Sequence, residues 1–283
     1  MFYLNEYIYI YIIIIIPYNY MLTRIANKRK RQQIEIKIAN VFKQVPYKGF
    51  KSSYNSIIPL KIYQTWNTKN LPSKMRERVE DLKAQNPKFE HFLFDDNDCR
   101  EFIRTNFETY VLDAYDRLIP GAYKADLWRL CVLYKNGGIY IDIKLNCVNG
   151  FKLIELTEKE HYVLDRLPPL SIYNAFMVCK AGNPFLWKAI CRIVLNVRNK
   201  FYGSSPLSPT GPKLLGDIIL RNNLRLNIDL VHHKNGGYIT YKNYFIISTD
   251  YPEYNSERTV TYNSMNSNLK RYDEMWKERR IYK

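Results

Sequence analysis

Two features typical of secreted proteins are absent from the sequence. No Cys-x-x-Cys pair occurs, and the odd number of cysteines argues against both a disulfide framework and a cysteine-ligated metal centre. No Asn-x-Ser/Thr sequon occurs either, although asparagine is abundant. Both absences disfavour a disulfide-bonded, glycosylated protein of an oxidising compartment. Cys131, Cys179 and Cys191 lie in apolar segments, so we expect them to be small core residues.

Negative charge is scarce, because 27 acidic residues stand against 43 basic residues and leave a net charge of +16. A basic surface suits partners that carry phosphate, such as nucleotide sugars, nucleic acid or anionic lipid headgroups. The aromatic residues do not interleave with the basic ones as they do on a stacking platform for nucleic acid. Nucleic-acid binding is therefore the least favoured of these classes. The abundance of Tyr, Lys, Asn and Ile leaves AT-rich codon usage as another source of the charge.

A long uninterrupted apolar run is also missing. The run over residues 7–16 ends before Pro17 and is shorter than the roughly 20 residues that a membrane-spanning helix needs. With residues 18–22 the segment just reaches that length. Residues 1–22 therefore have three open interpretations: a membrane anchor, which we favour, a signal-like segment, or translated upstream sequence before a true start at Met21. An anchor would make the protein membrane-associated, with the following basic cluster on the cytoplasmic side; the alternative location is cytoplasmic.

The rest of the chain divides by composition into two parts. Residues 23–57 are polar and basic, and we interpret them as a linker or helix outside the domain. Residues 58–283 should form the globular domain, because apolar periodicities of strands and helices alternate there. Strands are expected at 59–65, 89–94, 139–141, 162–164, 171–179, 228–232 and 238–241. Helices are expected at 73–84, 97–106, 109–118, 122–136, 184–201, from 212 onward and at 268–282. This alternation predicts an α/β fold with a mainly parallel sheet.

Three local signals refine this expectation. Asp98 and Glu101 have the spacing of a capping box, with Asp98 in the cap position. Asn235-Gly236 is typical of a β-hairpin turn. His232 and His233 are adjacent in the strand before that turn, so their side chains should face opposite sides, and we interpret both as edge-strand residues.

The central stretch of the domain reads as helix, stop and strand. Asp126 and Arg129 are three residues apart on the helix, so they should share one face. Asp142 follows the buried strand, where open α/β sheets place their ligands. Lys144 comes two residues later, so both side chains should point the same way off an extended backbone. The plain alternative is an ordinary amphipathic helix followed by a buried strand.

These residues closely resemble those of glycosyltransferase family 32. The resemblance rests on the helix with Asp126 and Arg129 and on the Gly-Gly-Ile-Tyr-x-Asp segment that ends at Asp142. That family holds yeast-type initiation-specific α-1,6-mannosyltransferases and mannosyl-inositol-phosphoceramide synthases, and its core is similar to that of clostridial glucosylating toxins. The resemblance covers roughly residues 58–282. It implies a GT-A type fold with a Rossmann-like, mainly parallel sheet.

The resemblance also implies an activity. The family transfers a hexose, with mannose as the default, from a nucleotide sugar donor such as GDP-mannose or a UDP-hexose to a hydroxyl of a glycan or glycolipid acceptor, with retention at the anomeric carbon. Asp126 and Arg129 would bind the donor sugar and phosphate, and Asp142 would hold ribose, sugar or a metal. A non-catalytic glycan or nucleotide-sugar binding module on the same fold is the alternative, and a basic nucleic-acid-binding protein ranks below it.

One position departs from the family pattern. The metal-binding Asp-x-Asp stands here as Asp142-Ile143-Lys144, so the second carboxylate is missing. This puts the use of Mn²⁺ or Mg²⁺ in question. Either Lys144 pairs with the donor diphosphate directly, or Asp142 and a C-terminal acid such as Asp273 still bind the metal. Loss of activity is a third, lower-ranked interpretation.

Further donor-binding candidates follow from the resemblance. Trp66 comes just after the opening strand, where it is either a stacking partner for the base or a core residue. Asn174 lies in a segment similar to one that lines the family's sugar site, and a buried asparagine bonded to backbone is the alternative. Gly211 and Pro212 match a Thr/Ser-Gly-Pro segment that opens a helix, or form a plain turn. Trp276 lies where relatives close the donor site, although the family's late His is absent.

Overall fold

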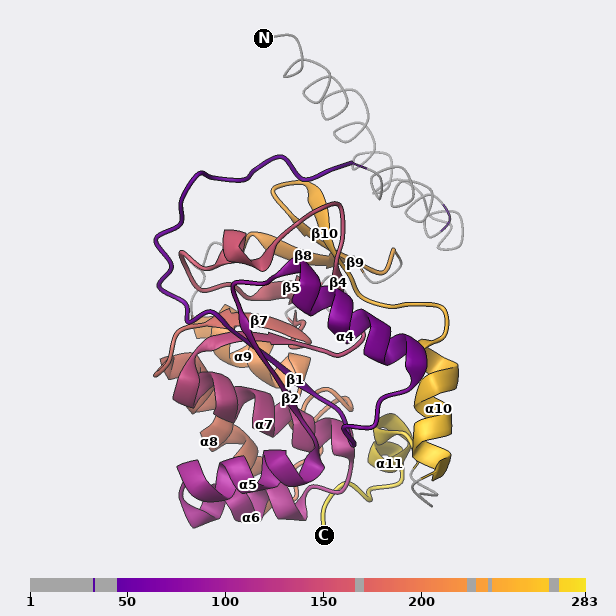
Figure 1. Ribbon diagram of the computed structural model, residues 1–283. Coiled ribbons are helices and arrows are strands. Elements are labelled where there is room, and N and C mark those ends of the chain that lie inside the picture. Colours follow the sequence, from indigo (N-terminus) through magenta and orange to yellow (C-terminus); the bar gives the residue numbers. More distant parts are fainter. Residues whose placement is uncertain (1–32, 34–44, 166–170, 223–227, 234–235, 265–269) are drawn as a thin grey trace. The chain divides into compact units, whose positions relative to one another are not determined.

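The computed structural model describes residue 33 and residues 45–165, 171–222, 228–233, 236–264 and 270–283 (Figure 1). The prediction for residues 1–22 and most of that for 23–57 lie outside this set. Residues 45–283 form one compact unit. Among the residues that the structure describes, no helix has both the length and the apolar character needed to cross a membrane.

A four-stranded sheet lies at the centre of this unit. Its strands, in spatial order, are β2 (Glu90–Phe94), β1 (Lys61–Thr65), β3 (Gly138–Ile141) and β7 (Phe176–Cys179). β1 is parallel to β2 and β3, whereas β7 is antiparallel to β3. The parallel strands are joined by helical crossovers, namely α4 (Ser73–Gln85) and then α5 (Asp96–Asn106), α6 (Thr109–Arg117) and α7 (Gly121–Asn136). The predicted α/β class and mainly parallel sheet are confirmed, and the arrangement is consistent with the GT-A type.

A second, mostly antiparallel sheet was not predicted as a unit. Its strands, in spatial order, are β4 (Asn146–Cys147), β10 (Tyr244–Ser248), β9 (Tyr238–Tyr241), β8 (Leu230–His233), β5 (Val163–Asp165) and β6 (Ser171–Ile172). The antiparallel pairing of β8 with β9 confirms the predicted hairpin, although Asn235 itself lies outside the described residues. The interpretation of His232 and His233 as edge-strand residues is wrong, because β8 lies between β9 and β5.

The central sheet separates two apolar cores. Side chains of a strand alternate between faces, so Tyr63 and Tyr140 pack among the helices, whereas Ile62 and Ile139 pack toward the second sheet. Figure 1 shows α5, α6, α7 and α8 gathered on one side and the strands of the second sheet on the other. The remaining elements are η2 (Leu153–Leu156), α8 (Pro184–Arg198), α9 (Pro212–Asn222), α10 (Tyr254–Ser264) and α11 (Tyr272–Lys277).

All five cysteines lie in the described residues and are free thiols. Cys131 and Cys179 are buried, as predicted, whereas Cys191 is only half-buried. Burial raises the pKa of Cys131 and Cys179, so both remain protonated and unreactive at neutral pH.

Several predicted elements differ in their limits. The capping box of α5 begins at Asp95, and Asp98 is its third helical residue rather than its cap. The predicted strand over 171–179 is interrupted at 173–175, where the chain turns into the candidate site. The predicted C-terminal helix is reduced to α11 within its described part, and α10 was not predicted.

The segment before the predicted domain start packs against the domain. Tyr47 is only 4% exposed, and its hydroxyl donates to Glu155 at 3.0 Å. The Tyr47 amide donates to the Asn149 carbonyl at 2.8 Å, and Tyr54 also bonds Glu155. Residues 45–57 therefore form a strap, a segment without helix or strand of its own. The strap covers the core that lies between the central sheet and the second sheet.

We expect a fragment that begins at residue 45 to fold as the full chain does. A fragment that begins at residue 58 should lose about 3 kcal/mol of unfolding free energy or more, because removal of Tyr47 empties a buried aromatic site. Urea unfolding of both fragments measures the difference. Equal stability of the two would show that the strap is dispensable and that residue 58 is the folding boundary.

Candidate active site

Arg129 lies at the centre of the candidate site. Its side chain is 8% exposed, and its guanidinium lies 3.6 Å from Asp126 and 3.4 Å from Asp142. Nη1 also donates to the Asn174 carbonyl at 2.9 Å, and Nε donates to Ala125 within the helix at 3.1 Å. Burial alone would lower the pKa of Arg129, but Tyr140 and the two carboxylates raise it overall. The predicted shared face of Asp126 and Arg129 is confirmed, and Asp142 joins them from the end of β3.

The carboxylate of Asp126 is held from two distant loops. Oδ1 accepts from the Asn174 amide at 2.9 Å, and Oδ2 accepts from the Thr210 hydroxyl at 2.7 Å. A Cβ at Gly211 would lie 3.1 Å from the same Oδ2, so the glycine permits this close approach. Burial raises the pKa of Asp126, while Arg129, Thr210 and Asn174 oppose that rise. Thr210 was not among the predicted site residues, although its Thr-Gly-Pro segment was the available signal.

Asp142 is the more accessible carboxylate, with 28% of its side chain exposed. Its Oδ1 accepts from the Tyr140 hydroxyl at 2.7 Å, and its amide donates to the Ala175 carbonyl at 2.8 Å. β3 lies between β1 and β7 in the central sheet, and the site lies at the end of β3 that Asp142 follows. Asp142 is therefore anchored through Oδ1 by Tyr140 of β3 and through its backbone by Ala175, just before β7, which leaves Oδ2 for a ligand.

The expected common direction of Asp142 and Lys144 is wrong. The Leu145 amide donates to the Asp142 carbonyl at 2.9 Å and closes a turn, so the backbone is not extended there. Ile143 is buried against α4, whereas the Lys144 ammonium lies 5.2 Å from the ring centroid of Tyr254 on α10. Asp142 faces Arg129, and Lys144 faces α10.

Aromatic and basic side chains from three elements meet beside Lys144. Trp66, just after β1, packs edge-on against Tyr254 with ring centroids 6.3 Å apart. The Arg258 guanidinium lies 5.9 Å from the centroid of the same Tyr254 ring. Trp66 is half-buried, so the structure places it between the two predicted roles of base platform and core residue.

The residues at this site do not fit a divalent ion held in the Asp-x-Asp manner. Among the described residues, no three His, Cys, Asp or Glu side chains gather closely enough to hold a metal. Asp142 Oδ1 is already bonded to Tyr140 and lies beside Arg129, and Lys144 holds the sequence position of the second carboxylate. Asp273 pairs instead with Arg271 at 3.1 Å. The predicted metal pair of Asp142 and Asp273 stays a prediction.

Trp276 is held by a bond to the backbone and by packing against the helical core. Its indole N–H donates to the Tyr202 carbonyl at 2.7 Å, and its ring packs against the helical core. Its predicted contact with the donor stays a prediction. Pro212 begins α9 directly after Gly211, so the helix starts beside the Asp126 carboxylate.

A further polar stack, missed in the sequence, borders the site. The ring of Tyr173 stacks on His232, with centroids 3.8 Å apart. His232 Nδ1 lies 3.1 Å from Asp165, and both of these residues are buried. Burial raises the pKa of Tyr173, and the charges of Asp142 and Asp165 raise it further. Tyr173 thus stays neutral beside Asn174, whose carbonyl and amide bind Arg129 and Asp126.

A known protein family and several known proteins are similar to this region of the chain. Residues 72–161 match the family described as "Glycosyltransferase sugar-binding region containing DXD motif". The chain is 31% identical over 157 residues to inositol phosphoceramide mannosyltransferase 3 of Schizosaccharomyces pombe. These residues are 55% of this chain and 41% of that protein. It is 28% identical over 106 residues to the initiation-specific alpha-1,6-mannosyltransferase of Candida albicans, covering 35% of this chain and 26% of that one.

A viral protein and a solved structure are also similar. An uncharacterized glycosyltransferase, L373 of Acanthamoeba polyphaga mimivirus, is 34% identical over 93 residues, which are 32% of this chain and 37% of that one. The solved PaToxG glycosyltransferase aligns with a TM-score of 0.47 at 16% identity, covering 90% of this chain and 96% of that one. The chain spans less than half the length of these curated relatives.

The matched region carries the residues on which the family resemblance rests. Asp126, Arg129 and Asp142 all lie within residues 72–161, and the structure brings the three side chains into one network. The similarities to the two yeast mannosyltransferases agree with the same assignment. Residues 72–161 of this chain are therefore similar to the family of glycosyltransferase sugar-binding regions that contain the DXD motif.

Proposed function

We propose that the protein is a retaining glycosyltransferase that moves a hexose, by first choice mannose, from a nucleotide diphosphate sugar to a hydroxyl of a glycan or glycolipid. The observation that carries this proposal is the buried Arg129, joined to Asp126 and Asp142 where β3 ends. Relatives named as mannosyltransferases of inositol phosphoceramide support mannose as donor sugar and a glycolipid as acceptor. Association with a membrane through residues 1–22 is part of the same proposal.

The two carboxylates would have different roles. Asp126 is fixed by Thr210, Asn174 and Arg129, so its remaining lone pairs have a set direction toward sugar hydroxyls. Asp142 is more exposed, and its Oδ2 would accept from a hydroxyl of the donor. Because catalytic geometry must be held closely, the bonds from the two loops are as important as the carboxylates themselves.

Arg129 would act mainly by balancing and orienting Asp126 and Asp142. A diphosphate departs with its bonding electrons when a sugar is transferred, so positive charge near that oxygen lowers the barrier. Arg129 already balances two carboxylates, which leaves the neutralisation of the diphosphate to other cations. Trp66 would stack on the base of the nucleotide, and Gly211 would let the start of α9 approach the sugar.

The proposal predicts hydrolysis of a nucleotide sugar without acceptor. We expect incubation with GDP-mannose, UDP-glucose and other nucleotide hexoses to release free hexose from one of them, detected by mass spectrometry. The screen should be run with Mn²⁺ and with a chelator, so that the result does not depend on the metal question. The binding-module alternative predicts calorimetric binding of a nucleotide sugar without turnover under both conditions, and that outcome would replace the proposed activity.

A further inference from the structure

Helix α10 brings a second cation to the aromatic ring against which Lys144 lies. Tyr254 and Arg258 are four residues apart on α10, and Lys144 reaches the same ring from the turn after β3. Both positive groups lie within 6 Å of the Tyr254 centroid. Within the part of the chain that the structure describes, neither Lys144 nor Arg258 forms an ion pair with a carboxylate. Two cations that lie against one aromatic ring, with no carboxylate paired to either, favour a bound anion.

The position of α10 does not depend on these cations. Glu257 accepts from the backbone amides of Lys74 at 2.7 Å and Met75 at 3.0 Å, in the first turn of α4. The residue before α4 is Pro72, which provides no side-chain cap, so Glu257 satisfies amides that would otherwise lack an acceptor there. The hydroxyl of Tyr251 also donates to Glu257 at 2.8 Å.

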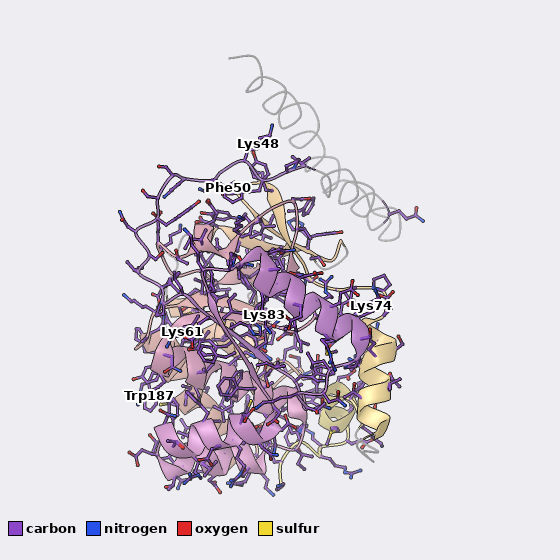
Figure 2. The ribbon with its side chains drawn as sticks, viewed as in Figure 1. Lys48, Phe50, Lys61, Lys74, Lys83 and Trp187 are labelled. Atoms are coloured by element: carbon purple, nitrogen blue, oxygen red, sulfur yellow. The ribbon has the colours of Figure 1, made fainter. Side chains whose placement is uncertain are left out.

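The docking of α10 on α4 is visible in the ribbon. Figure 1 shows α10 beside one end of α4, and Figure 2 labels Lys74 at that end. The helix carries its only first-turn acid, Glu257, in this contact, so that carboxylate is committed to α4 rather than to Arg258. We call Lys144 and Arg258 the cation pair. The helix beside them has a fixed position, and its Glu257 does not neutralise their charge.

The charge around Asp142 points to the same conclusion. A dication at Asp142 would lie beside Arg129, and Lys144, two residues later, shares the Tyr254 ring with Arg258. Repulsion from three cations would weaken metal binding at the low effective dielectric of a partly buried site. A diphosphate, in contrast, carries negative charge that Lys144 and Arg258 would balance.

We propose that Lys144 and Arg258 hold the diphosphate of the donor in place of a divalent ion, and this inference rests on the proposed function. Lys144 would act as a point charge, and Arg258 would donate from its planar fork to phosphate oxygens. In the transfer, the bond between the sugar C1 and the diphosphate oxygen breaks, and its electron pair stays on that oxygen. The acceptor hydroxyl oxygen forms the new bond to C1, and its proton passes to the departing diphosphate. The two cations stabilise the charge that develops on the leaving oxygen.

The test measures binding of GDP and UDP by calorimetry in the presence of a chelator, together with donor hydrolysis. We expect the unaltered chain to bind one of these nucleotides and to hydrolyse its sugar without metal. Lys144→Met and Arg258→Met keep an apolar stem over Tyr254 while removing the charge. Each should weaken nucleotide binding by about tenfold or more, as expected for the loss of a charge-assisted contact.

Lys61→Met is the matched control. Lys61 also lies over an aromatic ring, 6.0 Å from the centroid of Phe92. It begins β1, whereas Trp66 follows the other end of that strand. Figure 2 labels Lys61 at the left of the view and Lys74 at the right. This variant should bind and hydrolyse like the unaltered chain, and melting temperatures of all variants confirm that they are folded.

The outcomes separate the two proposals. If the unaltered chain binds nucleotide and hydrolyses donor only with Mn²⁺, the cation pair does not replace the metal, while the proposed function stands. The same conclusion follows if Lys144→Met and Arg258→Met, both folded, bind as well as Lys61→Met does. Absence of nucleotide binding and of donor hydrolysis, with and without Mn²⁺, would instead remove the proposed function and with it this inference.

Discussion

Replacing Arg129 with methionine is expected both to abolish donor hydrolysis and to destabilise the fold. Arg129 is nearly buried and balances Asp126 and Asp142, so its removal leaves two carboxylates without their cation. Breaking a buried pair by removing one partner costs about 3–5 kcal/mol. The Asn174 carbonyl also loses its charged donor. Urea unfolding gives the loss of stability, and hydrolysis of the donor identified by the screen gives the loss of activity.

Arg100→Met provides the matched control for this change. Arg100 donates to both carboxylate oxygens of Asp116, at 2.8 and 2.7 Å, but its side chain is 47% exposed. Because water and salt screen an exposed pair, this variant should lose no more than about 1 kcal/mol and keep full activity. If Arg129→Met loses stability but still hydrolyses the donor, the Arg129 network supports the fold and has no part in catalysis.

The parts of the site predicted from sequence are those set by local patterns. The helical period of α7 places Asp126 and Arg129 on one face, and Gly137 and Gly138, both at positive φ, end the helix before β3. Asp142 follows from the end of that strand. These relations involve neighbours within a few residues, so periodicity and glycine positions were sufficient to predict them.

The partners of Asp126 could not be predicted in the same way. Asn174 and Thr210 are 48 and 84 residues from Asp126, and only the folded chain brings their side chains to its two oxygens. A resemblance indicated Asn174 and Gly211 as site residues, but no pattern indicated which carboxylate they meet. The network is a product of tertiary packing, and sequence spacing carries no information about it.

The direction of Lys144 and the place of α10 could not be predicted for related reasons. One backbone bond, from Leu145 to Asp142, converts an expected extended segment into a turn and separates Lys144 from Asp142. The α10 segment contains Ser, Thr and Asn, which are weak helix formers, so its propensity gave little signal. Its link to α4 is made by Glu257 across 183 residues of sequence. The stack of His232 on Tyr173 likewise depends on the long-range parallel pairing of β5 with β8.

Asp142→Asn should separate catalysis from stability, in contrast to Arg129→Met. The amide oxygen of asparagine still accepts from Tyr140, and Arg129 retains Asp126, so no buried charge is left without a partner. Since 28% of the Asp142 side chain is exposed, we expect a loss of no more than about 1–2 kcal/mol in unfolding free energy. The negative charge that orients the donor sugar is lost, and donor hydrolysis should fall roughly 10²–10³-fold, as for other preorganised electrostatic groups.

Asp116→Asn is the matched control for Asp142→Asn. Asp116→Asn removes the partner of Arg100 on the surface, so it should change neither stability by more than about 1 kcal/mol nor hydrolysis. Calorimetry of the nucleotide alone adds a second readout, because Asp142 is assigned to the sugar and Lys144 to the diphosphate. GDP or UDP should therefore bind Asp142→Asn nearly as well as the unaltered chain, while the sugar is no longer released. A variant that is folded and still releases hexose at the original rate would show that Asp142 only orients Arg129.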